Sequence, residues 1–249
     1  MSRRRLTSGL FFEVIFMLTV VIPAYNEEKR LSKTLPALKE YMGGREHEIV
    51  VVDDGSADRT AKVASMFGCR VIRHAVNLGK GAAVKTGVLV SRGDLVLVTD
   101  ADLATPMEEL SKLEAALESG ADVAVGSRET PGAVVRRISI RRRLAGKVFN
   151  LMVRVFMGLP YFDTQCGFKL FKRDAAWALF TLAECRGYSF DVEVLVLARE
   201  MGFKVREVGV IWRDKSGSKV RLLWDGFRML KELAKIRQKC AAISSPAIP

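Results

Sequence analysis

Short apolar runs alternate with helix-like segments along the first half of the chain, and this alternation limits the folds open to it. The strand-like runs cover residues 18–22, 49–52, 70–72, 95–99 and 122–125. Helix-like segments lie between them, near residues 28–41, 57–67, 80–91 and 107–118. Strands that alternate with helices of this length form right-handed βαβ units. The sequence therefore predicts an α/β fold with a mostly parallel sheet flanked by helices.

The second half of the chain has a different pattern. Residues 136–157 are basic and apolar and are expected to be helical. A loop is expected at 163–167, followed by a helix near 173–182. Another helix is expected to begin at Phe190, and a strand should follow at 204–212.

Two acids, Asp100 and Asp102, stand one residue apart just after the apolar run that ends at Val98. Ligands of open α/β sheets bind at the edge where the parallel strands have their carboxyl ends. Two carboxylates this close repel each other unless they share a cation, and Mg²⁺ prefers one or two carboxylates together with substrate phosphates. These acids are therefore candidate ligands of a divalent cation.

A polar cluster, Pro23-Ala24-Tyr25-Asn26-Glu27, follows the first predicted strand. Pro23 is expected to stop strand pairing, and the polar groups after it can hydrogen-bond a nucleobase edge. The alternative is an ordinary turn with Asn26 as the cap of the next helix. Either way, the cluster is expected to share one edge of the sheet with the acids that follow the other strands.

The cluster Asp53-Asp54-Gly55-Ser56 follows the second predicted strand. One of its acids can accept a hydrogen bond from a base N–H or a ribose hydroxyl, while Gly55 would admit a ligand close to the backbone. The alternative is a simple turn in which Ser56 caps the following helix. Further on, Lys80 stands between two glycines at a helix start, where a diphosphate or base contact is plausible.

Composition narrows the chemistry. The formal net charge is +12, from 40 Lys+Arg against 28 Asp+Glu, which implies nucleic acid, an acidic membrane surface or a phosphorylated substrate as partner. Four widely spaced cysteines and two histidines disfavour a zinc site, a disulfide scaffold and a Ser-His-Asp triad. The cysteine pattern fits a cytosolic compartment.

In their order along the chain, these motifs resemble family 2 glycosyltransferases with the Rossmann-like GT-A fold. The motifs are Pro23 to Glu28, Asp53 to Ser56, Asn77-Leu78-Gly79-Lys80-Gly81, Asp100-Ala101-Asp102 and Gly126-Ser127-Arg128. Three later motifs look like the dolichyl-phosphate β-glucosyltransferase branch: Asp163 to Phe171, Phe190-Asp191-Val192-Glu193 and Gly217-Ser218-Lys219. The resemblance covers roughly residues 17–225. It implies an inverting transfer of glucose from UDP-glucose to dolichyl or another polyprenyl phosphate, with GDP-mannose or another nucleotide sugar as the alternative donor.

The resemblance also implies roles for individual residues. Asp100 and Asp102 would hold Mg²⁺ or Mn²⁺, although Ala104 stands where related mannose synthases have a Gln that contacts the metal. Arg128 would neutralise the leaving diphosphate or steady the acceptor phosphate, the alternative being a surface ion pair. Asp191 stands at the position of the family's catalytic base and would here orient the sugar, the alternative being an acid favoured by a helix dipole. The expected nucleotide-sugar contacts are Pro23, Ala24, Tyr25, Glu27, Asp53, Lys80, Asp100 and Ala101.

The acceptor phosphate needs a positive pocket, and several side chains in the second half are candidates for it, with a solvated helix face as the alternative. The basic amphipathic pattern of 220–239 suits a helix lying on an anionic membrane, although it can also pack on the sheet. The chain is therefore expected at the cytosolic face of a membrane. The expected acceptor-phosphate contacts are Arg141, Gln165 and Lys219.

The predicted organisation has three parts: an N-terminal extension (1–16), a glycosyltransferase domain (17–219) and a membrane-associating helix and tail (220–249). A non-enzymatic basic protein that binds RNA or membrane is the distant alternative. The sequence has no RRM, KH or helix-turn-helix signature, and acidic strand ends repel phosphate in the absence of a metal. Nucleic acid is therefore not expected as a partner.

Overall fold

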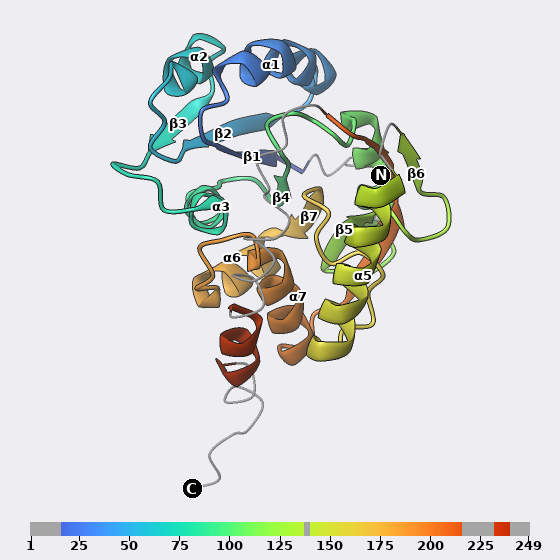
Figure 1. Ribbon diagram of the computed structural model, residues 1–249. Helices are drawn as coiled ribbons and strands as arrows, with labels where there is room; N and C mark the ends of the chain where they lie inside the picture. The colour runs from blue at the N-terminus through green and yellow to red at the C-terminus, as the bar shows by residue number, and fades with distance from the viewer. Residues whose placement is uncertain (1–15, 137–139, 216–231, 240–249) are drawn as a thin grey trace, which may run out of the picture.

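The protein is described here by a computed structural model (Figure 1). The described residues are 16–136, 140–215 and 232–239. Predictions for the N-terminal extension before Phe16, for Lys219 and for most of 220–249 lie outside them, so the three-part organisation stays a prediction. Within the described residues, no helix is both long enough and apolar enough to cross a membrane.

A seven-stranded mixed sheet forms the centre of the molecule. Its strands are β1 (Leu18–Ala24), β2 (His47–Asp53), β3 (Arg70–Arg73), β4 (Leu95–Val98), β5 (Val123–Ser127), β7 (Lys169–Lys172) and β8 (Val205–Gly209). Their order is β3-β2-β1-β4-β7-β5-β8. All neighbours are parallel except at β7, which runs antiparallel to both β4 and β5. Beside it, β6 (Val134–Arg136) and β9 (Ile211–Arg213) form a small parallel sheet.

Helices cover both faces of the sheet (Figure 1). They are α1 (Glu28–Met42), α2 (Thr60–Met66), α3 (Lys80–Leu89), α4 (Leu110–Glu118), α5 (Ile140–Met157), α6 (Arg173–Leu182) and α7 (Phe190–Glu200), with a short 3₁₀ turn η1 (Met107–Glu109) before α4 and a last helix at 232–239. Successive β1 side chains point to opposite faces, as strand geometry requires. Val20 and Ile22 pack in a core with α1, α2 and α4, whereas Val21 packs in the core of α3, α6 and α7.

The predicted α/β class is confirmed, and all five strand runs of the first half are strands. The sequence reading did not contain β7, whose antiparallel insertion between β4 and β5 makes the sheet mixed. The strand predicted at 204–212 divides at Val210 into β8 and β9, which belong to different sheets. Residues 134–136 form a strand, and the helix predicted from 136 begins at Ile140.

Pro23 is predicted to stop strand pairing, and this prediction is wrong for the pairing of β1 with β2. β1 continues through Ala24, which pairs with Asp53 of β2. Pairing with β4, in contrast, ends at Val21 opposite Val98. Proline has no N–H to donate, so it interrupts the ladder on one side of the strand only. The consequence is that β1 and β2 reach the edge of the sheet together.

Candidate active site

The loops that carry the predicted site residues meet at one edge of the sheet. β2, β1 and β4 are parallel neighbours, so their carboxyl ends lie side by side. β5 runs in the same direction as β4 because both pair antiparallel with β7 between them. The loop that enters β7 therefore lies between the ends of β4 and β5. The expected convergence of the three polar clusters on one edge is confirmed by this topology.

Asp100 and Asp102 lie in a tight turn directly after β4. The Leu103 amide donates a hydrogen bond to the Asp100 carbonyl at 3.1 Å, and Leu103 has a φ of +46°, which is uncommon for a non-glycine residue. Asp102 Oδ1 accepts the Ala104 amide at 3.0 Å. Burial, together with the nearby Asp100 carboxylate, raises the pKa of Asp102. The turn therefore holds two repelling acids that a cation would stabilise.

Lys80 supplies a positive charge to this turn. It is the first residue of α3, and its Nζ lies 2.6 Å from Asp100 Oδ1. Burial by itself would lower the pKa of Lys80, but the carboxylates of Asp100 and Asp191 outweigh it, and the pKa is raised. Lys80 is therefore an ammonium ion that links the end of β4 to the start of α7.

Asp191 lies in the first turn of α7 and is buried. It pairs with the ammonium of Lys169, which also donates to the Cys166 carbonyl at 2.5 Å. Burial raises the pKa of Asp191, while Lys169 and Lys80 act in the opposite direction. Sequence reasoning included Lys169 in the Asp163 to Phe171 motif without giving it a role. The available signal was a single charge inside the apolar run from Phe168 to Phe171.

The loop that enters β7 contacts both neighbouring strand ends. A Cβ on Gly167 would lie 2.4 Å from Asp100 Oδ2, so a larger residue there would displace this carboxylate or the loop. At the other end of the loop, the buried Asp163 accepts from Arg128 Nε at 2.7 Å and from Nη2 at 2.9 Å. Burial would raise the pKa of Asp163, but Arg128 outweighs it and the pKa is lowered.

Arg128 is therefore held by a buried carboxylate, which differs from the surface ion pair considered as its alternative. Its guanidinium also lies 5.5 Å from the centre of the Trp212 ring. Among the described residues, Nη1 of Arg128 has no hydrogen-bond partner. The arrangement fixes the side chain and leaves one donor nitrogen for an anion. Sequence reasoning had quoted Asp163 within a motif without giving it this role.

The two acids after β2 have different environments. Asp54 accepts the amides of Leu78 and Gly79, both at 2.9 Å, and His74 Nδ1 at 2.7 Å, so it fixes the loop before α3. Asp53 Oδ1 accepts the Ser56 amide at 2.9 Å. Its Oδ2 lies 3.2 Å from a nitrogen of Arg73 but receives no hydrogen bond among the described residues. Asp53 Oδ2 is therefore a buried carboxylate oxygen that has an ion pair but accepts no hydrogen bond among the described residues.

Neither alternative helix cap is present. The Asn26 side chain accepts the Ala57 amide, and Ser56 Oγ accepts the Asn26 amide, both at 2.9 Å, so the two residues brace the loops after β1 and β2. The expected approach of a ligand to Gly55 stays a prediction, but the structure gives this glycine another reason. A Cβ on Gly55 would lie 2.6 Å from the Val76 carbonyl carbon, so the glycine makes room for protein backbone on that side.

The remaining predicted site residues differ in solvent exposure and in the contacts they make. Tyr25 is exposed, whereas Ala24 and Ala101 are buried. Glu27 pairs with Arg30 at 3.0 Å. Gln165 lies in the loop before β7, and its amide donates to Asp163 Oδ1 at 3.2 Å. Arg141 lies in the first turn of α5, where only the backbone is described, so its predicted phosphate contact stays a prediction.

The donor set suits a hard divalent cation that takes further ligands from its substrate. The described residues contain no cluster of three His, Cys, Asp or Glu side chains that could hold a metal. Asp100 and Asp102 provide two carboxylates, and Asp100 is 39% exposed. Mg²⁺ sites of this kind use one or two carboxylates and complete the shell with phosphates and water. The two acids therefore fit such a cation when a diphosphate is present.

Comparison with known proteins agrees with this geometry. A family model described as glycosyl transferase family 2 matches residues 19–180. The chain belongs to glycosyl transferase family 2. Within this family, the chain is 36% identical to human dolichyl-phosphate beta-glucosyltransferase over 88% of its length and 74% of the relative. It is 38% identical to the Saccharomyces cerevisiae enzyme of the same name, over 90% of the chain and 75% of the relative.

A solved structure has the same fold. The glucosyl-3-phosphoglycerate synthase from Mycobacterium tuberculosis, in complex with Mn²⁺, UDP-glucose and phosphoglyceric acid, superposes with a TM-score of 0.64 at 20% identity. The match covers 92% of this chain and 78% of the other. The GT-A fold predicted from the motifs is thereby confirmed, and the chain is a glycosyltransferase.

Proposed function

We propose that this glycosyltransferase moves glucose from UDP-glucose to dolichyl or another polyprenyl phosphate, with inversion at the anomeric carbon. The observation that carries the proposal is the similarity to dolichyl-phosphate beta-glucosyltransferases over most of the chain. The cluster of Lys80, Asp100, Asp102 and Asp191 at the sheet edge supports it, because these groups suit a nucleoside diphosphate and a sugar.

On the donor side, Asp53 Oδ2 would accept a hydrogen bond from the uracil N–H or a ribose hydroxyl. This oxygen is buried and accepts no hydrogen bond among the described residues, although Arg73 Nε lies 3.2 Å away, and a buried acceptor without a hydrogen bond is costly. The exposed Tyr25 ring, with Glu27 and the backbone at Pro23 and Ala24, would line the base site beside it. This group of residues would orient the nucleoside without taking part in bond breaking.

Asp100 and Asp102 would hold Mg²⁺ or Mn²⁺ against the diphosphate. When bound, the cation would neutralise the negative charge that develops on the leaving nucleoside diphosphate. Lys80, whose Nζ lies 2.6 Å from Asp100 Oδ1, would add a positive charge beside the diphosphate. Ala101, between the two ligands, is buried and positions the turn through its carbonyl, which accepts the Thr34 hydroxyl at 2.9 Å.

On the acceptor side, a phosphate monoester is already an anion near neutral pH, because its second pKa is about 6. It therefore needs positioning more than deprotonation. Arg128 offers Nη1 for this purpose, and Arg141, Gln165 and Lys219 are the further proposed contacts. Asp191 is paired with Lys169 and close enough to Lys80 to influence it. Asp191 would therefore orient the sugar hydroxyls rather than remove a proton.

A membrane surface is the proposed source of the lipid acceptor. α5 carries a row of exposed apolar side chains at helical spacing: Val148 is 60%, Leu151 56%, Met152 41% and Val155 76% exposed. An amphipathic helix of this kind lies in the interface plane of a membrane. The net charge of +12 favours an anionic leaflet, and we place the enzyme at the cytosolic face.

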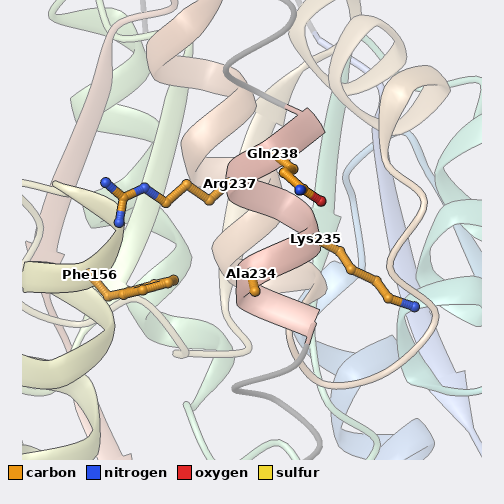
Figure 2. A pocket seen from close by; sticks show the side chains of 5 residues that line it. All are labelled: Phe156, Ala234, Lys235, Arg237 and Gln238. Atoms are coloured by element: carbon orange, nitrogen blue, oxygen red, sulfur yellow. The ribbon is translucent and has the colours of Figure 1, made fainter.

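A groove next to α5 has the same mixed character. Figure 2 shows Phe156 of α5 facing the helix at 232–239, whose Ala234, Lys235, Arg237 and Gln238 complete the lining. The Arg237 guanidinium lies 5.1 Å from the centre of the Phe156 ring. Apolar surface and basic groups side by side suit contact with anionic lipid.

The experiment that tests the proposal is sugar transfer to polyprenyl phosphate extracted from membranes, with UDP-glucose and GDP-mannose compared in the presence and absence of Mn²⁺. Metal-dependent transfer from UDP-glucose alone is the expected result. Transfer from GDP-mannose alone would refute the donor assignment while leaving the acceptor and the fold in place. Binding of the purified protein to RNA that survives alanine at both Asp100 and Asp102 would support the distant alternative of a nucleic-acid-binding protein.

A further inference from the structure

The helix at 232–239 is anchored in the core close to α6 and α7 (Figure 1). Leu233 is fully buried and Ile236 is 4% exposed, and both belong to the same core cluster as the α7 side chains. The polar side chains of this helix reach the loop at 183–189, which joins α6 to α7. The helix is therefore in position to act on that loop.

Glu193 of α7 holds the loop from within. It is 1% exposed, and its Oε2 accepts the amides of Glu184 at 2.9 Å and Cys185 at 2.7 Å. Its other oxygen, Oε1, lies 3.2 Å from Nζ of Lys239. The same ammonium lies 3.2 Å from the Glu184 carboxylate and donates to the Leu182 carbonyl. One lysine of the last helix thus binds the buried acid and the loop together.

Glu232 provides a second contact at the opposite end of the helix. Its carboxylate accepts the Cys185 thiol at 3.4 Å, and a Cβ on Gly187 would lie 2.9 Å from its Oε1. Burial and the neighbouring carboxylate raise the pKa of the Cys185 thiol to about 12, so the thiol is a neutral donor. Both ends of the helix therefore contact the same loop.

The far side of this loop supports Lys80. The Gly81 amide donates to the Arg186 carbonyl at 2.8 Å. A Cβ on Gly79 would lie 2.3 Å from the Arg186 carbonyl oxygen, and one on Gly81 would lie 2.2 Å from that of Cys185. The backbones are thus in contact on both sides of Lys80. A shift of the loop must move the first turn of α3, and with it the ammonium that meets Asp100.

We propose that Lys239 and Glu193 are positioning residues for Lys80, so that the helix at 232–239 controls the geometry of the donor site. Removing Lys239 leaves a buried carboxylate without its cation, which is unfavourable, and the loop that this carboxylate holds must rearrange. The expected effect on the donor rests on the proposed function. The series of contacts that runs from Lys239 through Glu193 and the 183–189 loop to Gly81 can be tested without any substrate.

The test compares Lys239→Met with Lys235→Met. Lys235 lies one helical turn earlier, is exposed and points away from Phe156 and Arg237 (Figure 2). Among the described residues it forms no ion pair or hydrogen bond, so its replacement removes the same charge without removing a contact to Glu193 or to the loop. The first readout is amide hydrogen exchange of the free protein. Faster exchange at Glu184, Cys185 and Gly81 in Lys239→Met, and wild-type exchange in Lys235→Met, is the expected result.

The second readout is steady-state transfer. Lys239→Met is expected to raise the KM for UDP-glucose about tenfold, an increase worth about 1.4 kcal/mol, with a smaller change in the KM for the acceptor. Lys239→Arg should restore most of the loss because it keeps the ion pair. If Lys239→Met does not fold, the nearly isosteric Glu193→Gln takes its place with the same expectations.

The outcomes separate the two proposals. Exchange and donor KM in Lys239→Met equal to those of Lys235→Met would overturn the positioning role. If the wild-type protein does not use UDP-glucose, the proposed function fails. The exchange at Gly81 then still decides whether the last helix supports the first turn of α3.

Discussion

Gly167→Ala tests the close packing of the β7 loop against the turn that carries Asp100 and Asp102. The added Cβ would lie 2.4 Å from Asp100 Oδ2 and 2.9 Å from the carboxyl carbon, whereas an ordinary contact begins at 3.4 Å. Either the Asp100 carboxylate or the loop must therefore move by about 1 Å. The backbone at Gly167 does not have a positive φ, so the change acts through this contact rather than through backbone strain.

A displacement of about 1 Å at a reacting group can cost about a hundredfold in rate, which corresponds to about 2.7 kcal/mol of transition-state stabilisation. We expect this loss in kcat/KM for glucosyl transfer, together with a higher Mn²⁺ concentration for half-maximal activity. The assay is initial-rate transfer to polyprenyl phosphate over a Mn²⁺ titration. The thermal unfolding midpoint, measured by circular dichroism, establishes whether the variant remains folded.

Gly146→Ala is the matched control. A Cβ at Gly146 in α5 meets nothing within 4 Å, and a helical glycine replaced by alanine gains about 1 kcal/mol in stability. This variant should therefore keep wild-type activity and unfold at the same or a higher temperature. The reasoning is refuted if Gly167→Ala is folded and its kcat/KM stays within about twofold of the wild type. Glucosyl transfer would then not depend on the exact position of the Asp100 carboxylate.

Further predictions concern the metal, the acceptor, the membrane and pH. Asp102→Ala should abolish turnover because it removes a proposed metal ligand, and near-normal activity at saturating Mn²⁺ would exclude that role. Lys219→Ala should raise the KM for the acceptor more than that for UDP-glucose; an unchanged acceptor KM would argue against a phosphate contact. Leu151→Glu combined with Val155→Glu should reduce cosedimentation with anionic vesicles, since both side chains are exposed on α5, and unchanged binding would move the contact elsewhere. Because the folded-state pKa of Asp163 is lowered, its stabilising effect is complete above the unfolded value of about 3.9 and is lost as the pH falls through the lower folded value. Urea unfolding of wild type and Asp163→Asn should therefore differ at neutral pH and converge in acid.

Much of this site could be predicted from short stretches of sequence. The alternation of apolar runs and helical segments gave the α/β class, and in a parallel sheet every strand must end at the same edge. The turn at Asp100 and Asp102, the acid at Asp53 and the lysine at the start of α3 are therefore placed by local pattern alone. Their chemical types then indicated a diphosphate and a cation.

Other features depend on pairs that local pattern cannot connect. Arg128 and Asp163 are 35 residues apart, and Lys169 and Asp191 are 22 apart. Their pairing follows from the insertion of β7 between β4 and β5, a choice of partners that strand propensity does not specify. The roles of Asn26, Gly55 and Ser56 were likewise decided by loops that touch only in the folded chain.

The sequence by itself determined the class of fold, the edge at which the site lies and the kinds of group present there, because hydrophobic periodicity and strand direction act over a few residues. Only the tertiary structure decided which charges pair and which remain open to a ligand. It alone placed Glu193 beside Lys239, 46 residues later in the sequence. It also packed the 183–189 loop between this pair and the first turn of α3, which carries Lys80. The physical reason is that burial turns a charge into a group that must find a partner, and packing selects that partner.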